Sequence, residues 1–186
     1  TVPDGLLGEF IKSIKYGVSR MSLVLKSESF KDGDRLKTPH VLSEAYGFGC
    51  TGGNLSPQLA WSGVPEGTES FSLTCYDPDA PTGSGFWHWN VANIPANIFS
   101  LELGSGDLSA GKMHPDAVEV RTDFGVPGYG GPCAPEGSNI HRYIFTVHAV
   151  NVKSLPVTPD TTAAILGFYL NFHTIEKASL IGLFSR

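Results

Sequence analysis

The stretch HRYIFTVHAVNV, residues 141–152, decides the fold class. β-Branched and aromatic side chains occupy both of its alternating faces, which is typical of a strand that is buried on both sides. FWHWNVANIP (86–95) is also strand-like and ends at a proline, and QLAWSGVPEGTESFSLTCYD (58–77) contains one or two strands around a VPEGT turn. Short strands bounded by Gly and Pro predict a mainly β protein, built as an antiparallel β-sandwich.

The ends of the chain add three elements to this prediction. MSLVLKS (21–27) alternates like a strand, and ASLIGLFSR (178–186) reads as a closing strand. Between them, residues 157–179 predict a C-terminal helix with Thr158 as its cap and Pro159 in its first turn. We expect the buried stripe of this helix to contain Ile165, Leu166, Tyr169, Phe172 and Ile175.

Length and composition predict a single domain over residues 21–186, preceded by an N-terminal extension over residues 1–20. The net charge of −5 and the 13 Lys and Arg residues, which form no cluster, argue against nucleic-acid binding. No apolar run approaches the roughly 20 residues that cross a bilayer, so we expect no integral membrane association. The sequence favours a cytoplasmic protein; secretion to the periplasm or beyond is the alternative if a signal peptide was removed.

Three cysteines, Cys50, Cys75 and Cys133, form an odd and sparse set without metal-binding spacing. This pattern favours buried or incidental thiols in a reducing compartment. A Cys50–Cys133 disulfide is the alternative, because both residues lie in glycine-rich segments.

Motifs for cofactor binding and nucleophilic catalysis are not found in the sequence. GFGCTG (47–52) matches the letters of a dinucleotide fingerprint, but Pro57 blocks the helix that the fingerprint requires. There is no G-x-S-x-G elbow and no H-E-x-x-H pair. We therefore expect no cofactor and no enzymatic activity.

Residues 104–139 form a long segment rich in Gly and Pro. Long ordered loops in compact domains are usually functional. Val118, Val120, Phe124 and Tyr129 offer apolar anchors. We therefore predict an ordered ligand-binding loop.

Chemically active side chains stand where the predicted strands begin and end. Asp77 closes one strand on its apolar face, while His88 and His141 lie near the starts of two others. In a regular strand, the alternation of side chains places His88 on the same face as Phe86 and Asn90. It places Trp87 and Trp89 together on the opposite face, either as packing or as an aromatic box for an ammonium group.

The types of these groups predict a small anion pocket. The imidazoles of His88 and His141 and the phenol of Tyr143 can donate hydrogen bonds, and the backbone N–H groups of Gly130 and Gly131 can line an anion-binding concavity. Asp77 would accept a proton from one imidazole and fix its tautomer. The rival is a metal site formed by Asp77, His88 and His141, but it would leave no partner to orient the ligands, so we expect no metal.

Several motifs together resemble the phosphatidylethanolamine-binding proteins, or Raf kinase inhibitor-like proteins, in their bacterial and archaeal branch. The motifs are GGNLSPQLAWSGVPEGT (52–68), DPDAP (77–81), GFWHW (85–89), VANIP (91–95), GYGGPCAPEG (128–137) and HRY (141–143). The resemblance implies a β-sandwich whose ligand-binding residues are Asp77, His88, Gly130, Gly131, His141 and Tyr143.

The same resemblance implies a structural turn formed by Pro78, Asp79, Pro81 and Arg142. It implies a cis Ala80–Pro81 bond, and a role for Arg142 in bracing the turn through a carboxylate. The implied ligand is phosphate or a phosphorylated head group like that of phosphatidylethanolamine, and a homodimer is among the oligomeric states to expect.

These observations lead to three hypotheses about function. The first is a non-enzymatic protein that binds a small phosphate- or carboxylate-bearing ligand, with regulation as the role to test. The second is a hydrolase that uses the imidazoles as acid and base. The third is a protein-interaction or protease-inhibitor module that acts through surface loops.

Overall fold

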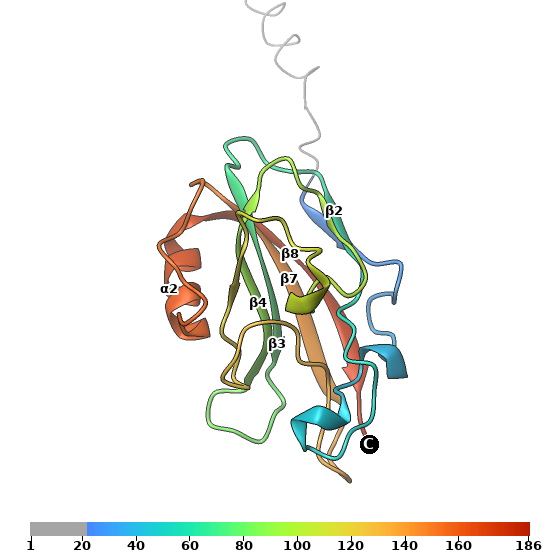
Figure 1. Ribbon diagram of the computed structural model, residues 1–186. Coiled ribbons are helices and arrows are strands. Elements are labelled where there is room, and N and C mark those ends of the chain that lie inside the picture. Colours follow the sequence, from blue (N-terminus) through green and yellow to red (C-terminus); the bar gives the residue numbers. More distant parts are fainter. Residues whose placement is uncertain (1–21) are drawn as a thin grey trace, which may run out of the picture.

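The computed structural model describes residues 22–186, in which two antiparallel sheets pack face to face and one helix lies outside them (Figure 1). The smaller sheet has the order β1 (Val24–Lys26), β2 (Leu59–Ser62), β5 (Ser100–Leu101). The larger has the order β6 (Val118–Val120), β4 (Phe86–Pro95), β3 (Ser70–Asp77), β7 (His141–Val150), β8 (Thr174–Phe184). The predicted antiparallel β-sandwich is confirmed, whereas the extension predicted for residues 1–20 lies outside the described residues.

The main core lies between the two sheets. Alternate residues of β3 and β7 face inward, as the period-two pattern predicted, and meet apolar side chains of β1 and β2. The buried residues that these four strands contribute are Leu25, Leu59, Trp61, Phe71, Leu73, Cys75, Tyr143, Phe145, Val147 and Ala149. The segment 58–77 therefore contains two strands, and its VPEGT turn carries the chain from one sheet to the other.

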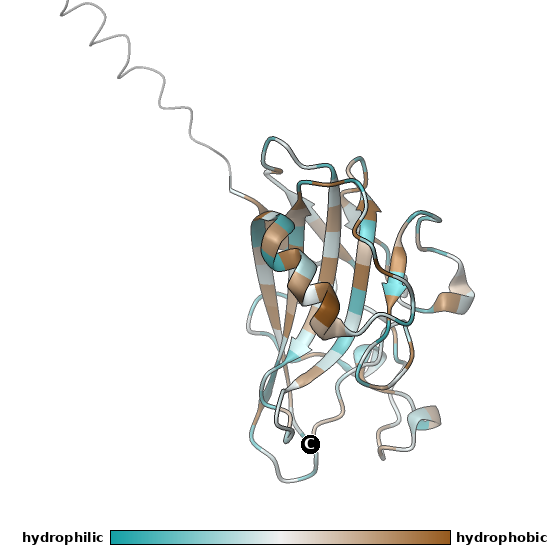
Figure 2. Ribbon diagram, turned by 90° about the vertical axis from the view of Figure 1, so that its left-hand side faces the viewer, coloured by the Kyte–Doolittle hydropathy of each residue, from teal (hydrophilic) through white to brown (hydrophobic). Residues whose placement is uncertain are grey.

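The helix α2 (Ala163–His173) covers part of the outer face of the larger sheet (Figure 2). It begins later than predicted, because Thr162 is the N-cap and its hydroxyl accepts the N–H of Ile165 at 3.3 Å. Thr158 instead forms a separate turn, in which its N–H donates to Oγ1 of Thr161.

The buried face of α2 also differs from the prediction. Ala163, Leu166 and Leu170 face the sheet, so Leu166 is the only member of the predicted stripe that is fully buried in the helix. Exposed apolar residues of α2 include Ile165, Phe168 and Phe172. The apolar residues of this segment occur all around the helix, so their spacing alone could not determine which side packs.

A β-bulge in β4 overturns the predicted arrangement of the two tryptophans. Trp87 pairs with Tyr76 and Trp89 pairs with Cys75, which leaves His88 as an extra residue between them. Trp89 is fully buried in the main core, whereas Trp87 borders a hollow beside α2. The two indoles therefore lie on opposite faces of the sheet, and neither an aromatic box nor a shared packing face is formed.

The segment 104–139 is ordered, as predicted, but it is not loop throughout. Residues 118–120 form the edge strand β6, which pairs with β4. Tyr129 is buried in the main core, and its hydroxyl donates to the carbonyl of His40 at 2.9 Å. This anchoring holds the second half of the segment against the lower end of the sandwich in Figure 1.

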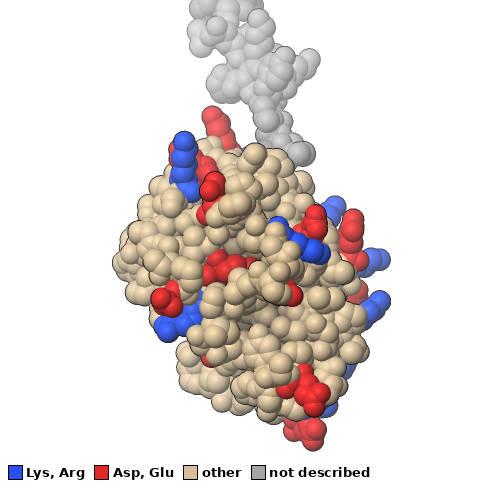
Figure 3. Space-filling model, in the orientation of Figure 1, with Lys and Arg blue, Asp and Glu red and all other residues tan. Residues whose placement is uncertain are grey.

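Charged side chains are dispersed over the face shown in Figure 3, where basic groups are separated by acidic ones. Within residues 22–186, no helix combines the length and the apolar character that crossing a bilayer requires.

Candidate anion-binding site

Asp77 and His141 form a buried pair where β3 ends and β7 begins. Nδ1 of His141 donates to Oδ2 of Asp77 at 2.7 Å, and both side chains are almost fully buried. The other carboxylate oxygen, Oδ1, accepts the N–H of Asp79 at 2.8 Å. Asp77 therefore fixes the tautomer of the imidazole, as predicted, and both of its oxygens have hydrogen-bond donors.

The turn after Asp77 is held by a two-point ion pair. The guanidinium of Arg142 donates through Nε and through one terminal nitrogen to the two oxygens of Asp79, each at 2.9 Å. This pairing lowers the pKa of Asp79 and raises that of Arg142, and it confirms the bracing role predicted for Arg142.

The Ala80–Pro81 bond is trans, so the cis bond implied by the resemblance is wrong: residues 22–186 contain no cis peptide. Pro78 lies in the same turn, and Pro81 contributes to the wall of the site.

His88 is oriented by the loop that contains the Gly-Gly pair. Its Nδ1 lies 2.7 Å from the carbonyl oxygen of Gly130, and its side chain is buried. Burial lowers the pKa of His88, although the Gly130 hydrogen bond and the charge of Asp77 act in the opposite direction. The ring is therefore held neutral over a wider pH range than an exposed histidine.

Gly130 and Gly131 contribute in a different way from the one predicted. The N–H of Gly130 donates to the carbonyl of His88, and the N–H of Gly131 donates to Oδ1 of Asn54. Both donors are thus used within the protein, so the predicted anion-binding concavity is not formed. These positions require glycine because a Cβ would collide with Phe124 at Gly130 and with the His40 backbone at Gly131.

Asn54 is a residue of the site's framework that the sequence reasoning missed. Its amide donates to the carbonyl of Tyr129 at 3.0 Å and accepts from Gly131 at 2.8 Å, so it positions the loop that holds His88. Its left-handed backbone, with φ of 51°, is one that asparagine adopts more readily than most residues. The Gly-Gly-Asn sequence at 52–54 was the available signal.

The side chains of Asp77, His88, His141 and Tyr143 line one hollow of about 190 Å³. Aromatic rings form much of the remaining wall: Phe86 and Phe124 are 4.8 Å apart between ring centroids, and Phe48 lies 5.8 Å from Phe124. Burial and the charge of Asp77 raise the pKa of the Tyr143 hydroxyl, which therefore stays protonated. The four predicted side chains thus line the same hollow, and aromatic residues form much of the rest of its wall.

A disulfide closes one side of this hollow. Cys50 and Cys133 are joined, with a Cα–Cα distance of 5.9 Å, and Cys133 belongs to the lining. The favoured prediction of three unpaired thiols is therefore wrong for this pair. The two glycine-rich segments pack against each other, which brings cysteines 83 residues apart in the sequence within bonding distance. Cys75 is free and buried, and burial raises its pKa.

The described part of the chain contains no group of three His, Cys, Asp or Glu side chains arranged to hold a metal ion. At the candidate site, Oδ2 of Asp77 is bonded to His141 and Nδ1 of His88 to a carbonyl. These contacts orient the two imidazoles toward the hollow as hydrogen-bonding groups.

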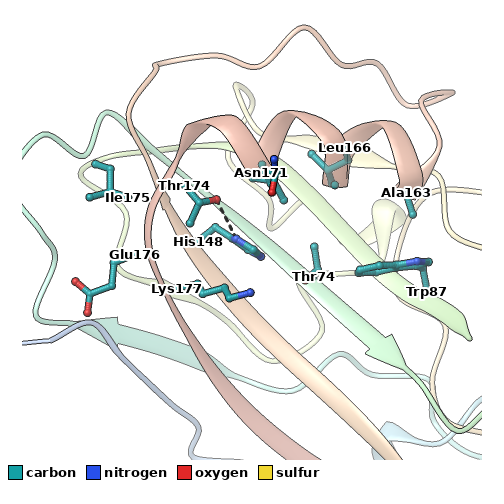
Figure 4. A pocket seen from close by; sticks show the side chains of 12 residues that line it. Thr74, Trp87, His148, Ala163, Leu166, Asn171, Thr174, Ile175, Glu176 and Lys177 are labelled. Carbon is teal, nitrogen blue, oxygen red and sulfur yellow. Dashed lines mark hydrogen bonds between the residues drawn. The ribbon is translucent and has the colours of Figure 1, made fainter.

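A second, larger hollow of about 420 Å³ lies between α2 and the outer face of the sheet (Figure 4). Nδ1 of His148 is 3.1 Å from Oγ1 of Thr174 there, and burial, aided by the charge of Lys177, lowers the pKa of His148 to about 4. No carboxylate is bonded to this imidazole among residues 22–186. The smaller hollow is therefore the better candidate site, because it contains the coupled Asp-His pair.

Comparisons with known proteins agree with this fold. The family model described as phosphatidylethanolamine-binding protein matches residues 26–185. Two Escherichia coli relatives, the UPF0098 proteins YbcL and YbhB, are 46% and 48% identical over 90% and 87% of this chain, and over 90% and 99% of their own.

Solved structures give the same result. The crystal structure of E. coli YbcL, described as a member of the mammalian PEBP family, superposes with a TM-score of 0.85 at 45% identity, covering 89% of this chain and 99% of that one. A putative phosphatidylethanolamine-binding protein homolog from Chlamydia trachomatis matches with a TM-score of 0.73 at 26% identity, over 89% of this chain and 99% of its own. The chain therefore belongs to the phosphatidylethanolamine-binding protein family.

Proposed function

We propose that this protein binds a small anion, a phosphate or carboxylate group carried on a small ligand such as a phosphorylated head group, in the hollow lined by Asp77, His88, His141 and Tyr143. The observation that carries the proposal is the buried Asp77–His141 pair beside a second oriented imidazole. Each ring uses Nδ1 within the protein, so Nε2 is the nitrogen left for a ligand. Two imidazoles that can share a ligand's negative charge suit an anion.

The pocket functions by binding rather than catalysis. A covalent mechanism needs a nucleophilic side chain that an adjacent base activates. The hydroxyl and sulfur side chains in the lining are Thr82, Tyr143 and Cys133, and the Cys133 sulfur is bonded to Cys50. This supports a binding role over a hydrolase that forms a covalent intermediate.

The disulfide also bears on the compartment. Disulfides persist in oxidising environments and are rare in the cytosol. The Cys50–Cys133 bond therefore supports a periplasmic or otherwise oxidising location over the cytoplasmic one that the cysteine count favoured. The homodimer and any regulatory or inhibitory role stay predictions.

Calorimetry and phosphorus NMR with inorganic phosphate and phosphoethanolamine test the proposal. We expect the wild-type chain to bind at least one of them, and His88→Ala and His141→Ala each to weaken binding about 10- to 100-fold, the value of a charged hydrogen bond. His148→Ala, in the second hollow, is the matched control and should bind like the wild type.

Two results would contradict this account. Binding that survives both pocket substitutions would place the anion elsewhere. Turnover of phosphate or carboxylate esters by the wild type, lost in His88→Ala, would favour the hydrolase instead.

A further inference from the structure

The hydrogen bonds of His88 determine which of its nitrogens carries a proton. The carbonyl oxygen of Gly130, 2.7 Å from Nδ1, can only accept, so Nδ1 must be protonated. When the ring is neutral, its Nε2 is therefore a bare lone pair. An anion brought against that lone pair is repelled unless Nε2 gains a proton.

Neighbouring groups define the electrostatic setting of His88. Asp77 on β3 and Asp123, after β6, place negative charge near the ring, while His141 and Tyr143 share the hollow from β7. The carboxylate of Asp123 accepts the N–H of Trp87 at 2.8 Å. Both acids favour a protonated imidazole, but burial is the larger effect and lowers the pKa of His88.

The apolar residues that line the rest of the hollow determine which chemical group can be attached to the anionic group of the ligand. Phe48, Phe86 and Phe124 line the hollow, together with Leu42 and Pro135. Asp77 is the only carboxylate of this lining, and each of its oxygens already accepts a hydrogen bond within the protein. An ammonium group next to the anion would therefore meet only this engaged carboxylate in the lining, whereas a flat apolar group would pack against the three rings.

We propose that the pocket binds acids whose anionic group is joined directly to a flat apolar body, and that each anion is bound together with at least one proton, held on Nε2 of His88. The proton comes from the solvent, and no covalent bond of the ligand changes. This inference rests on the proposed anion-binding function and specifies the ligand class of the same site.

Calorimetry of the full chain with benzenesulfonate measures the proton directly, because this anion does not itself titrate between pH 6 and 8. Titrations at each pH in two buffers with different heats of protonation give the number of protons taken up. At pH 8 we expect uptake of at least about one proton per anion, and a loss of at least about tenfold in affinity per pH unit above the pKa of His88. Uptake near zero at pH 8 would overturn the proposal.

Phenyl phosphate, phosphoethanolamine and inorganic phosphate test the ligand class. We expect phenyl phosphate to bind at least about tenfold more tightly than phosphoethanolamine, because the phenyl ring packs on the phenylalanines. Equal affinities for the two ligands, or tighter binding of phosphoethanolamine, would overturn the proposed ligand class. If none of the anions binds at any pH, the proposed function itself fails.

Two variants separate the contribution of the His88 proton from that of packing on the phenylalanine rings. His88→Gln replaces the titrating ring by a neutral amide, so residual binding should take up about one proton fewer than the wild type, while His148→Gln should take up as many protons as the wild type. Phe48→Ser changes a side chain that is 57% exposed and should leave folding intact. The substitution should weaken the binding of phenyl phosphate several-fold and leave the binding of inorganic phosphate unchanged. An equal effect on the binding of both ligands would contradict the packing argument.

Discussion

Replacing both Cys50 and Cys133 by alanine is expected to lower the free energy of unfolding by about 3 to 4 kcal/mol. The bond closes a long loop, since the cysteines are 83 residues apart, and its loss restores chain entropy to the unfolded state. For a domain of this size the melting temperature should fall by roughly 10 °C. Calorimetric melting of the variant and of the wild type, with and without reductant, measures this change.

Cys75→Ala serves as the matched control, because it removes the buried free thiol and leaves the disulfide in place. It should lose only about 1 kcal/mol, through a small cavity, and should still be destabilised by reductant. A wild-type melting temperature that reductant does not change would show that the bond contributes no stability.

Replacing Glu119 by glutamine is expected to stabilise the protein at alkaline pH. Glu119 is buried on β6, where one oxygen accepts the indole N–H of Trp89 at 2.9 Å and the other has no partner among residues 22–186. Burial raises its pKa to about 8, against a lowering effect of the Trp89 hydrogen bond. The folded protein therefore keeps this carboxyl group protonated at neutral pH.

The direction of the pH effect follows from this raised pKa. Between about pH 4.5 and pH 8 the folded state holds a proton that the unfolded state releases, so stability falls as the pH rises through that range. Glutamine does not titrate, so Glu119→Gln should match the wild type at pH 4 and exceed it by about 4 kcal/mol at pH 8.

Urea unfolding at the two pH values measures this difference. Glu102→Gln, at an exposed acid, should show no comparable gain at pH 8. A Glu119→Gln variant that is equally stable relative to the wild type at both pH values would contradict a raised pKa.

Much of the fold could be predicted because its strands carry strong local signals. The prediction for β4 matches the observed bounds, and β7 begins at His141 as expected. Asp77, at the end of β3, therefore lies beside the start of β7, and the period-two pattern correctly placed it on the buried face. The meeting of Asp77, His88, His141 and Tyr143 follows from these strand ends.

The errors concern features that depend on contacts distant in sequence. The bulge at His88 is created by pairing with β3, and it separates Trp87 from Trp89, which a regular strand would keep together. The Cys50–Cys133 bond and the hydrogen bond from Gly131 to Asn54 arise when the 40–54 segment packs on the loop, and the hydrogen bonds of Gly130 join the same loop to His88 on β4. No local pattern contains that information.

The buried Glu119 illustrates a second kind of limit. In the segment 104–139, the short strand β6 has only three residues, too few for a period to be read from the sequence. Its pairing with β4 directs Glu119 toward Trp89. Glutamate is rarely buried in proteins, so the residue type offered no reason to expect burial at position 119.

Nitrogen NMR of the histidine side chains, recorded during titration with inorganic phosphate, tests the central claim most directly. We expect the Nε2 signals of His88 and His141 to shift as the anion binds, and the signals of His148 and His173, which lie outside the hollow, to remain unchanged. Phosphate binding that leaves the signals of His88 and His141 unchanged would contradict an anion site between these two residues.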